Sequence, residues 1–321
     1  MKKTLFALSL TFLFACDSNK SSNISDKDTY ATTDYLLEDN SISKLLTSNH
    51  QQLISQTGDF KSFKIYLDKL DNDSATSIPF ALDYINTCIS SGNIDRDSIF
   101  LLFNVKFYAI ANRLSNSLDT KYKFLIDQLD KDSNTVELKY FKNNLQSCGL
   151  DIFSSEGMYY LDVEPNFFYN NFKGRVSDGV KEYLNIRKDE LKQEFSEDAG
   201  MLISFEDLYL RVKRWEIFIN KYPNTVYYGE ANSYYITYLE TLMTGMDNSR
   251  VFDFDNNSLL PEIKTLYEKI KNETPESQTT KVISSYYDFL ARHDFKENDS
   301  IDIFLKNKNL STMLAIQPHT R

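Results

Sequence analysis

Apolar residues recur at helical spacing along most of the chain from residue 59 onward. In the segment 204–222, Leu208, Val212 and Trp215 follow one another at intervals of four and three residues, which places them on one face of a helix. The same spacing predicts further helices over 59–70, 77–91, 95–115, 120–130, 135–148, 177–199, 226–244, 258–272, 275–292 and 300–306. Nine Gly and six Pro are few for 321 residues, whereas all-β folds need many turn residues. The sequence therefore predicts an all-α fold.

Polar residues that precede the apolar stripes mark where helices begin. Asp59 and Ser77 each stand at a predicted N-cap, and Asp95 or Asp97 begins the third helix. Ser204, three residues before an acidic residue, is similar to a capping box. These positions fix the expected helix starts more sharply than the apolar stripes alone.

The pattern changes between residues 150 and 165. Aromatic and β-branched residues on both sides of Gly157 predict a short β-hairpin or an extended crossing over 152–163. We take this change as the boundary between an N-terminal helical half, 37–150, and a C-terminal helical half, 151–308. Residues 309–321 read as a loose tail.

The first residues form a targeting segment. Lys2 and Lys3 precede an apolar stretch from Thr4 to Phe14, and a bilayer-spanning helix needs about 20 apolar residues, so this stretch is too short to cross a membrane. Its end, Leu13-Phe14-Ala15-Cys16, resembles a bacterial lipoprotein signal. The resemblance implies a signal peptide over 1–15 and a lipid on Cys16. Two other interpretations stay open: a secretory signal with a chance Cys, and a buried N-terminal helix.

A lipid on Cys16 implies a protein held at the membrane of the cell envelope. Residues 17–33 are almost all polar, so the segment 16–36 is expected to be a flexible tether that carries the lipidated Cys. Asp17 resembles an inner-membrane retention signal that operates in some bacteria and not in others. The choice of membrane therefore stays open, and we expect an outer-membrane or periplasm-facing location rather than the inner membrane.

Charge and cysteine content narrow the class of partner. Removal of Lys2 and Lys3 with the signal leaves 34 basic residues against 46 acidic ones, a net charge of −12. Such a surface disfavours nucleic acid, which binds to basic patches. Cys88 and Cys148 form either one disulfide in an oxidising compartment or two buried thiols.

No motif for catalysis or for metal binding stands out. His50, His293 and His319 lie far apart in the sequence, and no zinc-helix, nucleophile-elbow or phosphate-loop pattern occurs. The runs 253–257 and 130–134 begin like calcium loops but lack the Gly and the final Glu, so they are interpreted as caps and turns. We therefore expect no enzyme activity, no cofactor and no metal.

One stretch resembles a known helical family. Trp215–Ala231 contains a Tyr-Pro pair ending at Pro223, a polar residue, Asn224 or Thr225, in position to cap the next helix, and a small residue, Ala231, where two helices would cross. It is similar to the helix-turn-helix junction of tetratricopeptide-like (TPR-like) envelope lipoproteins. No clean second copy occurs, so a TPR-like helical-hairpin array and a generic helical bundle both stay open.

The aromatic doublets supply the functional hypothesis. The candidate binding surface consists of Tyr159, Tyr160, Phe167, Phe168 and Tyr169, although ordinary packing between helices explains such doublets equally well. We predict a membrane-anchored module, without catalysis, that binds a protein partner of the envelope through its helices. The alternative is a lipoprotein that binds a glycan or another small ligand through exposed aromatic rings.

Overall fold

The structure, a computed structural model, describes residues 59–90, 95–131, 134–155, 157–308 and 310. All of them belong to one compact unit. The predicted signal peptide, Cys16, the tether and most of the predicted tail lie outside the described residues. No helix of the described part is both long enough and apolar enough to span a membrane.

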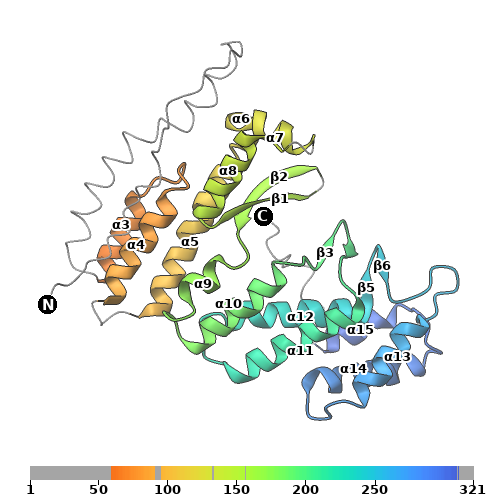
Figure 1. Cartoon of the computed structure of the whole chain (residues 1–321). Coiled ribbons are helices and arrows are strands. Elements are labelled where there is room, and N and C mark those ends of the chain that lie inside the picture. The colour runs from red at the N-terminus through yellow and green to blue at the C-terminus, as the bar shows by residue number, and fades with distance from the viewer. Residues whose placement is uncertain (1–58, 91–94, 132–133, 156, 309, 311–321) are drawn as a thin grey trace, which may run out of the picture. The chain divides into compact units, whose positions relative to one another are not determined.

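Helices dominate the first part of the described chain. Its elements are α3 (Phe60–Lys69), α4 (Ser77–Ser90), α5 (Arg96–Ser115), α6 (Leu118–Lys121), α7 (Lys123–Leu129), α8 (Val136–Ser147), β1 (Leu150–Ser155), β2 (Met158–Val163) and α9 (Phe167–Phe172) (Figure 1). Strands β1 and β2 pair antiparallel, with Leu150 opposite Val163, so the predicted hairpin is confirmed.

The second part continues with longer helices joined by small hairpins. Its elements are α10 (Asp178–Glu190), β3 (Ser196–Glu197), β4 (Gly200–Met201), α11 (Phe205–Lys221), α12 (Tyr228–Thr244), β5 (Gly245–Met246), β6 (Ser249–Arg250), α13 (Pro261–Lys271), α14 (Gln278–Ala291) and α15 (Ser300–Asn307). Each sheet of the described part is a two-stranded hairpin. The fold is therefore mostly helical, as predicted.

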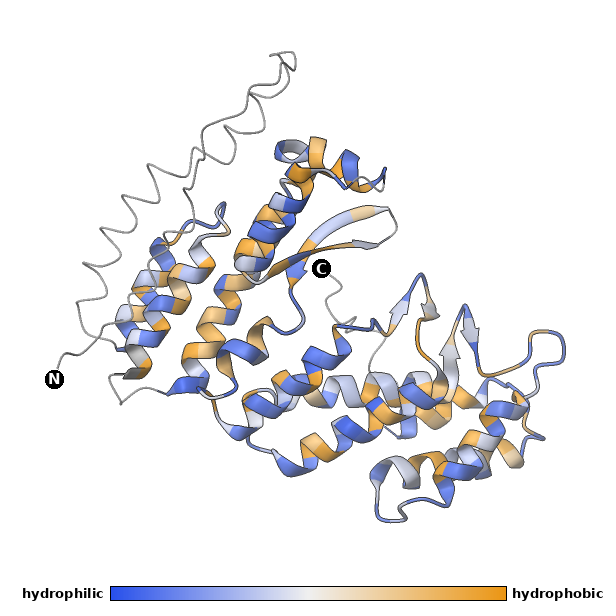
Figure 2. Ribbon diagram, viewed as in Figure 1, coloured by the Kyte–Doolittle hydropathy of each residue, from blue (hydrophilic) through white to orange (hydrophobic). Residues whose placement is uncertain are grey.

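Hydrophobic residues form stripes along the helices (Figure 2). The stripes of α5 and α9 meet in a shared aromatic core, where the Phe103 ring lies 5.3 Å from that of Phe172 and the Phe107 ring lies 4.8 Å from that of Phe168. Helix α9 follows the predicted boundary at residue 150 and α5 precedes it. The two predicted halves therefore share one core.

Most of the predicted helix N-caps are confirmed, and those at Ser77 and after Pro223 are wrong. Asp59 and Ser204 accept backbone N–H groups at the starts of α3 and α11, and Asp95 does so at the start of α5. Ser77 is instead the first residue of α4, and its hydroxyl donates to the Asp71 carbonyl 2.7 Å away. Helix α12 begins after Tyr227, without a side-chain cap, so neither polar residue after Pro223 caps it.

The turn between α8 and β1 depends on a glycine. Gly149 has φ +82°, and a Cβ placed there would lie 2.3 Å from the Phe167 ring. Only glycine adopts this backbone conformation at little cost. The turn places β1 directly after α8, beside the aromatic core.

Replacing Gly149 with alanine should lower the free energy of unfolding by about 2 kcal/mol or more, from backbone strain and steric overlap together. Gly157→Ala is the matched control, because Gly157 also has a positive φ of +77° but nothing lies within 4 Å of its added Cβ. It should cost about 1 kcal/mol, the strain alone. Urea unfolding of both variants measures the difference. An equal loss of unfolding free energy in the two variants would show that the Phe167 ring moves aside without an energetic cost.

Candidate functional site

Helix α10 presents aromatic and charged side chains on one face. Ser177 caps the helix, and Tyr183, Arg187 and Glu190 follow at intervals of four and three residues. This spacing places the three side chains on one side of the helix. They meet side chains of α11 and α12, which pack against each other. We define the Arg187 cluster as Tyr108, Asp162, Tyr183, Arg187, Glu190, Trp215, Glu230, Tyr234 and Tyr238.

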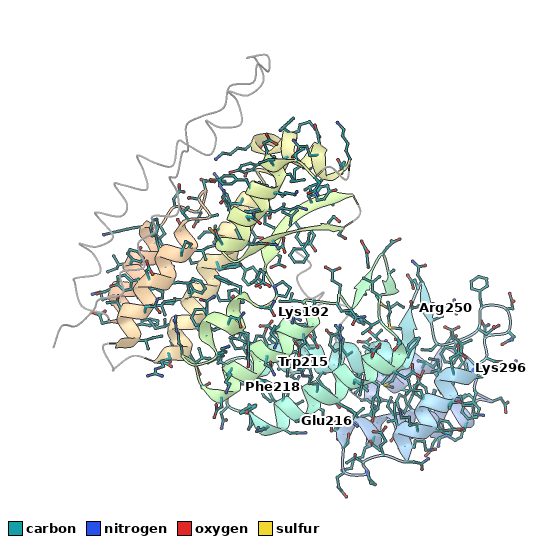
Figure 3. All side chains as sticks on the ribbon, viewed as in Figure 1. Lys192, Trp215, Glu216, Phe218, Arg250 and Lys296 are labelled. Carbon is teal, nitrogen blue, oxygen red and sulfur yellow. The ribbon has the colours of Figure 1, made fainter. Side chains whose placement is uncertain are left out.

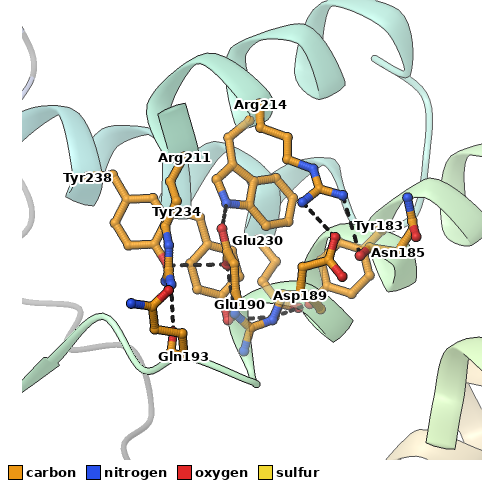
Figure 4. Close-up of polar contacts among 12 residues, drawn as sticks. Tyr183, Asn185, Asp189, Glu190, Gln193, Arg211, Arg214, Glu230, Tyr234 and Tyr238 are labelled. Carbon is orange, nitrogen blue, oxygen red and sulfur yellow. Dashed lines mark hydrogen bonds and ion pairs between the residues drawn. The ribbon is translucent and has the colours of Figure 1, made fainter. Parts of the chain in front are cut away.

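A buried carboxylate holds the centre of the cluster together (Figure 4). Glu190 is 5% exposed. It accepts hydrogen bonds from Trp215 Nε1 at 2.8 Å, from Arg187 Nη1 at 3.0 Å and from the Tyr238 hydroxyl at 3.2 Å. A buried charge is tolerated only when it is paired and hydrogen-bonded in this way. Glu190 therefore fixes the position of the guanidinium of Arg187.

Arg187 has N–H donors that no described residue uses. Its guanidinium carbon lies 4.5 Å from the centre of the Tyr234 ring, and its side chain is 23% exposed. Arginine has five N–H donors and stays charged in proteins. Among the described residues Nε and Nη2 of Arg187 have no hydrogen-bond partner. These donors are therefore available to a ligand.

Glu230 places a carboxylate at the exposed edge of the cluster. Its Oε1 accepts from the Tyr183 hydroxyl at 2.5 Å and from the Tyr234 hydroxyl at 3.4 Å. The Tyr183 ring in turn stacks on that of Tyr227 with centroids 4.0 Å apart. Within the described part of the chain, no group donates to Oε2 of Glu230, so this acceptor is open to a ligand.

Tyr108 of α5 and Asp162 of β2 complete the cluster from the first part of the chain. Strand β2 is fixed on α5 because Ser115 Oγ accepts from the backbone N–H of Leu161 at 2.8 Å. Asp162 Oδ1 accepts from its neighbour's backbone N–H. Burial raises the pKa of Asp162, and Arg187 acts in the opposite direction. Oδ2 of Asp162 accepts from no group that the structure describes.

The charges of the cluster act on the hydroxyl of Tyr108. Burial raises the pKa of Tyr108 most, and Asp162 and Arg187, then Tyr234 and Glu230, act on the same hydroxyl. The hydroxyl therefore stays protonated at neutral pH. It has no hydrogen-bond partner among the described residues, so it can both donate to and accept from a ligand.

The five side chains of the predicted binding surface have different environments. Phe167 and Phe168 are 9% and 8% exposed and lie in the aromatic core, so they are not surface residues and that part of the prediction is wrong. Tyr159 is half-buried. Tyr160 and Tyr169 are also half-buried, and each has neighbours that connect it to the cluster.

Tyr160 and Tyr169 flank the Arg187 cluster. Tyr160 stands two residues before Asp162 on β2, so the two side chains share a face of the strand. Burial and the nearby Glu194 carboxylate raise the pKa of Tyr160 to about 12. The Tyr169 ring lies 4.4 Å below the ammonium of Lys188, the residue that follows Arg187 on α10.

Of the three cysteines, Cys148 is the one whose side chain the structure describes. Cys148 is buried directly after α8, and the side chain of Cys88 and all of Cys16 lie outside the described part, so the disulfide and the lipid stay predictions. The described residues contain no group of His, Cys, Asp or Glu that could hold a metal ion. Asp253 accepts the backbone N–H groups of Asp255 and Asn256, as expected for a turn.

Sequence reasoning missed the charged members of the cluster. Tyr108, Asp162, Arg187 and Glu230 come from four different elements, so no short motif contains them. One feature of the sequence could have indicated the cluster: Arg187 and Glu190 stand among the inward-facing positions of α10. Charged residues at such positions normally form ion pairs or have a functional role.

Comparisons with known proteins leave the site to be interpreted from its own geometry. No protein-family model, no curated protein and no solved structure matches this chain.

Proposed function

We propose that the chain is a lipid-anchored envelope protein that binds a small ligand at the Arg187 cluster and does not catalyse a reaction. The lipoprotein-like end of the signal, Leu13 to Cys16, supports the anchor. This function corresponds to the alternative that the sequence left open. The proposed site is the Arg187 cluster and not the five-residue aromatic surface that the sequence suggested.

One observation carries the proposal. Arg187, whose side chain is 23% exposed, and the exposed carboxylate of Glu230 both contact Tyr234, and each keeps hydrogen-bonding atoms that no described residue uses. Ligand sites combine rigid aromatic walls with a few such groups. Glu190 supplies the rigidity, because it holds Arg187 and Trp215 in place.

Thermal unfolding with a panel of small ligands tests this function. Neutral sugars, amines, carboxylates and phosphates are added in turn to the purified protein, and one class should raise the melting temperature by about 5 °C at saturation, because a ligand that binds only the folded state stabilises it. The Tyr108→Phe, Asp162→Asn double variant should lose the rise. Tyr286→Phe is the control, because it removes a tyrosine hydroxyl that has no partner among the described residues and belongs to α14, away from the cluster.

Equal rises in the double variant and the wild type would place the ligand elsewhere. No rise with any class would contradict small-ligand binding.

Recognition of a protein partner is the second candidate function. Two apolar side chains of α11, Leu210 and Ile217, are 60% and 63% exposed and stand two helical turns apart. Between them Arg214 pairs with Asp189 at 2.9 Å. Apolar groups bordered by charges are typical of protein interfaces. This surface would support the protein-binding module that the sequence favoured.

The Leu210→Ser, Ile217→Ser double variant tests the second candidate. We expect an unchanged free energy of unfolding within about 0.5 kcal/mol, since both side chains are exposed. In-cell crosslinking should recover one envelope protein with the wild type and not with the variant. Val105→Ser is the matched control, because Val105 is 71% exposed on α5. The same protein recovered with all three would exclude this surface.

A further inference from the structure

We infer that the exposed face of α11 binds the same face of a second copy of this chain, with the two α11 helices antiparallel about a two-fold axis. The inference rests on the second candidate function, because it names the partner of that same surface. A second copy is the partner that fits, because the apolar and charged residues of this face are arranged in a pattern that is complementary to itself.

The exposed face of α11 lies opposite the buried face of the helix. Leu208, Val212 and Trp215 are buried, whereas Leu210 and Ile217 are 60% and 63% exposed. Residues seven positions apart on a helix differ in direction by only about 20°. Leu210 and Ile217 therefore form the apolar centre line of one face.

The two ends of this face carry opposite charges. Glu206 stands in the first turn of α11 and Lys221 in the last turn, and both are exposed. Glu206 precedes Leu210 by four residues, and Lys221 follows Ile217 by four residues. Side chains at this spacing are neighbours on the helix surface. The face therefore runs from an acidic end through two apolar residues to a basic end.

These four positions are symmetric about the midpoint between residues 213 and 214. Leu210 and Ile217 stand at equal distances from this midpoint, and so do Glu206 and Lys221. A two-fold axis through the midpoint, perpendicular to the helix, places Leu210 opposite the Ile217 of a second copy. It also places Glu206 opposite the Lys221 of that copy. Such a self-complementary patch is what a two-fold symmetric dimer requires.

The charges choose the antiparallel orientation. A parallel pair would place Glu206 opposite Glu206 and Lys221 opposite Lys221, and like charges across an interface cost binding free energy. The antiparallel pair also aligns the helix dipoles favourably. The whole chain has a net charge of −10, so two copies repel each other over most of their surface. A face with both signs at opposite ends removes this repulsion locally.

Cations also lie at the middle of the face, and each has its own counter-ion. Lys213 pairs with Glu273 at 2.8 Å, and Arg214 pairs with Asp189 at 2.9 Å. Two copies that meet at the midpoint therefore bring together neutral pairs and not bare cations. Ion pairs that border an apolar centre are typical of the rim of a protein interface.

Two further cations of the region interact away from the midpoint. The Lys188 ammonium lies 3.6 Å from Asp189 and 4.4 Å from the centre of the Tyr169 ring. Arg211 stands on another side of α11, where it donates to the backbone carbonyl of Gln193 at 2.5 Å. Neither cation belongs to the line from the acidic end to the basic end of the face.

Sedimentation velocity over a range of protein concentrations tests the inference, with Cys16→Ala in every chain so that no lipid contributes to association. We expect a monomer–dimer equilibrium, and a weak one because the face of a single helix is small. Leu210→Asp should weaken the dimer roughly tenfold or more, because it buries a charge against the Ile217 of the second copy. Val105→Asp is the matched control, since Val105 is 71% exposed on α5.

Charge reversal tests the antiparallel register. Glu206→Lys should weaken the dimer about tenfold, because two lysines then face each other at both ends. Adding Lys221→Glu to the same chain should restore the affinity to within about threefold, since both pairs re-form with their signs exchanged. Glu137→Lys is the matched control, because Glu137 is an exposed first-turn glutamate of α8 as Glu206 is of α11.

A dimer that Leu210→Asp weakens and that the combined charge reversal restores would support the inference. A chain that stays monomeric at every concentration would overturn it, and so would a dimer that Leu210→Asp leaves unchanged. A combined reversal no better than Glu206→Lys alone would overturn the antiparallel pairing.

In-cell crosslinking separates this inference from the second candidate function. Recovery of a second copy of the chain, lost in the Leu210→Ser, Ile217→Ser variant, would support both. A monomeric chain that still recovers a different envelope protein through Leu210 and Ile217 would overturn self-association and leave the second candidate function intact.

Discussion

Replacing Glu190 with alanine should lower the free energy of unfolding by about 3–5 kcal/mol, the largest effect that we expect of any substitution discussed for this protein. The carboxylate is 5% exposed and accepts from Trp215, Arg187 and Tyr238. Its loss leaves the largely buried guanidinium of Arg187 without its counter-ion. It also leaves the indole N–H of Trp215 and the hydroxyl of Tyr238 without their acceptor. Chemical denaturation measures the change.

Two further variants show how much of the loss in Glu190→Ala comes from the buried charge. Glu276→Ala is the control for losing a glutamate, because Glu276 is 93% exposed and, among the described residues, forms an ion pair only with Lys281 at the surface. Exposed pairs of this kind contribute little. Glu190→Gln should lie between the two, since it keeps an acceptor but loses the charge. If Glu190→Ala were no less stable than Glu276→Ala, the central ion pair would not hold the cluster.

Replacing Glu216 with alanine should cost about 3 kcal/mol. Glu216 lies on α11 beside Trp215 (Figure 3) and is 7% exposed. Its hydrogen bonds, however, go to the start of α14. Its carboxylate accepts from the Ser277 hydroxyl at 2.7 Å, the Thr279 hydroxyl at 2.6 Å and the Gln278 backbone N–H at 2.5 Å. It also places a negative charge at the positive end of the α14 dipole.

The consequence should concentrate on α14 and its neighbours. Amide hydrogen exchange should show faster opening of Gln278–Ala291 in Glu216→Ala, while α4 and α5 keep their protection. Ser277→Ala is the matched control. It removes the local N-cap and one donor to Glu216 but leaves the carboxylate in place, and it should cost about 1 kcal/mol. Unchanged protection of α14 in Glu216→Ala would contradict the capping role.

The helices could be predicted because their causes are local. The stripe of Leu208, Val212 and Trp215 and the cap at Ser204 are contained in one short segment, and α11 follows them closely. The hairpin predicted over 152–163, which the structure extends back to Leu150, follows for the same reason, since its strand residues and its Gly157 turn are adjacent in sequence.

The small hairpins could not be predicted because distant residues stabilise them. The apolar stripe of α10 continues to Phe195, but that ring leaves the helix and packs on Tyr238 with centroids 5.0 Å apart. The turn of β3–β4 contains Asp198 at φ +45° and Ala199 at φ +56°, which few non-glycine residues adopt. Asn248 of the β5–β6 turn donates to Ala199 and supports this conformation.

The candidate site escaped prediction for a related reason. Some of the aromatic doublets lie beside the Arg187 cluster, but the doublets do not tell which ring faces the core. Helix α9 turns both Phe167 and Phe168 toward α5, whereas Tyr160 and Tyr169 stay at the edge of the cluster. The polar partners of these tyrosines lie on elements that only the tertiary fold brings together.

Affinity selection from an extract of envelope small molecules tests the central claim most directly, since it requires no choice of ligand class. The purified protein and its Tyr108→Phe, Asp162→Asn variant are incubated with the extract, separated from unbound material, and analysed for retained compounds by mass spectrometry. We predict a compound retained by the wild type and by Tyr286→Phe but not by the double variant. No retained compound, or equal retention by the double variant, would contradict recognition of a ligand at the Arg187 cluster.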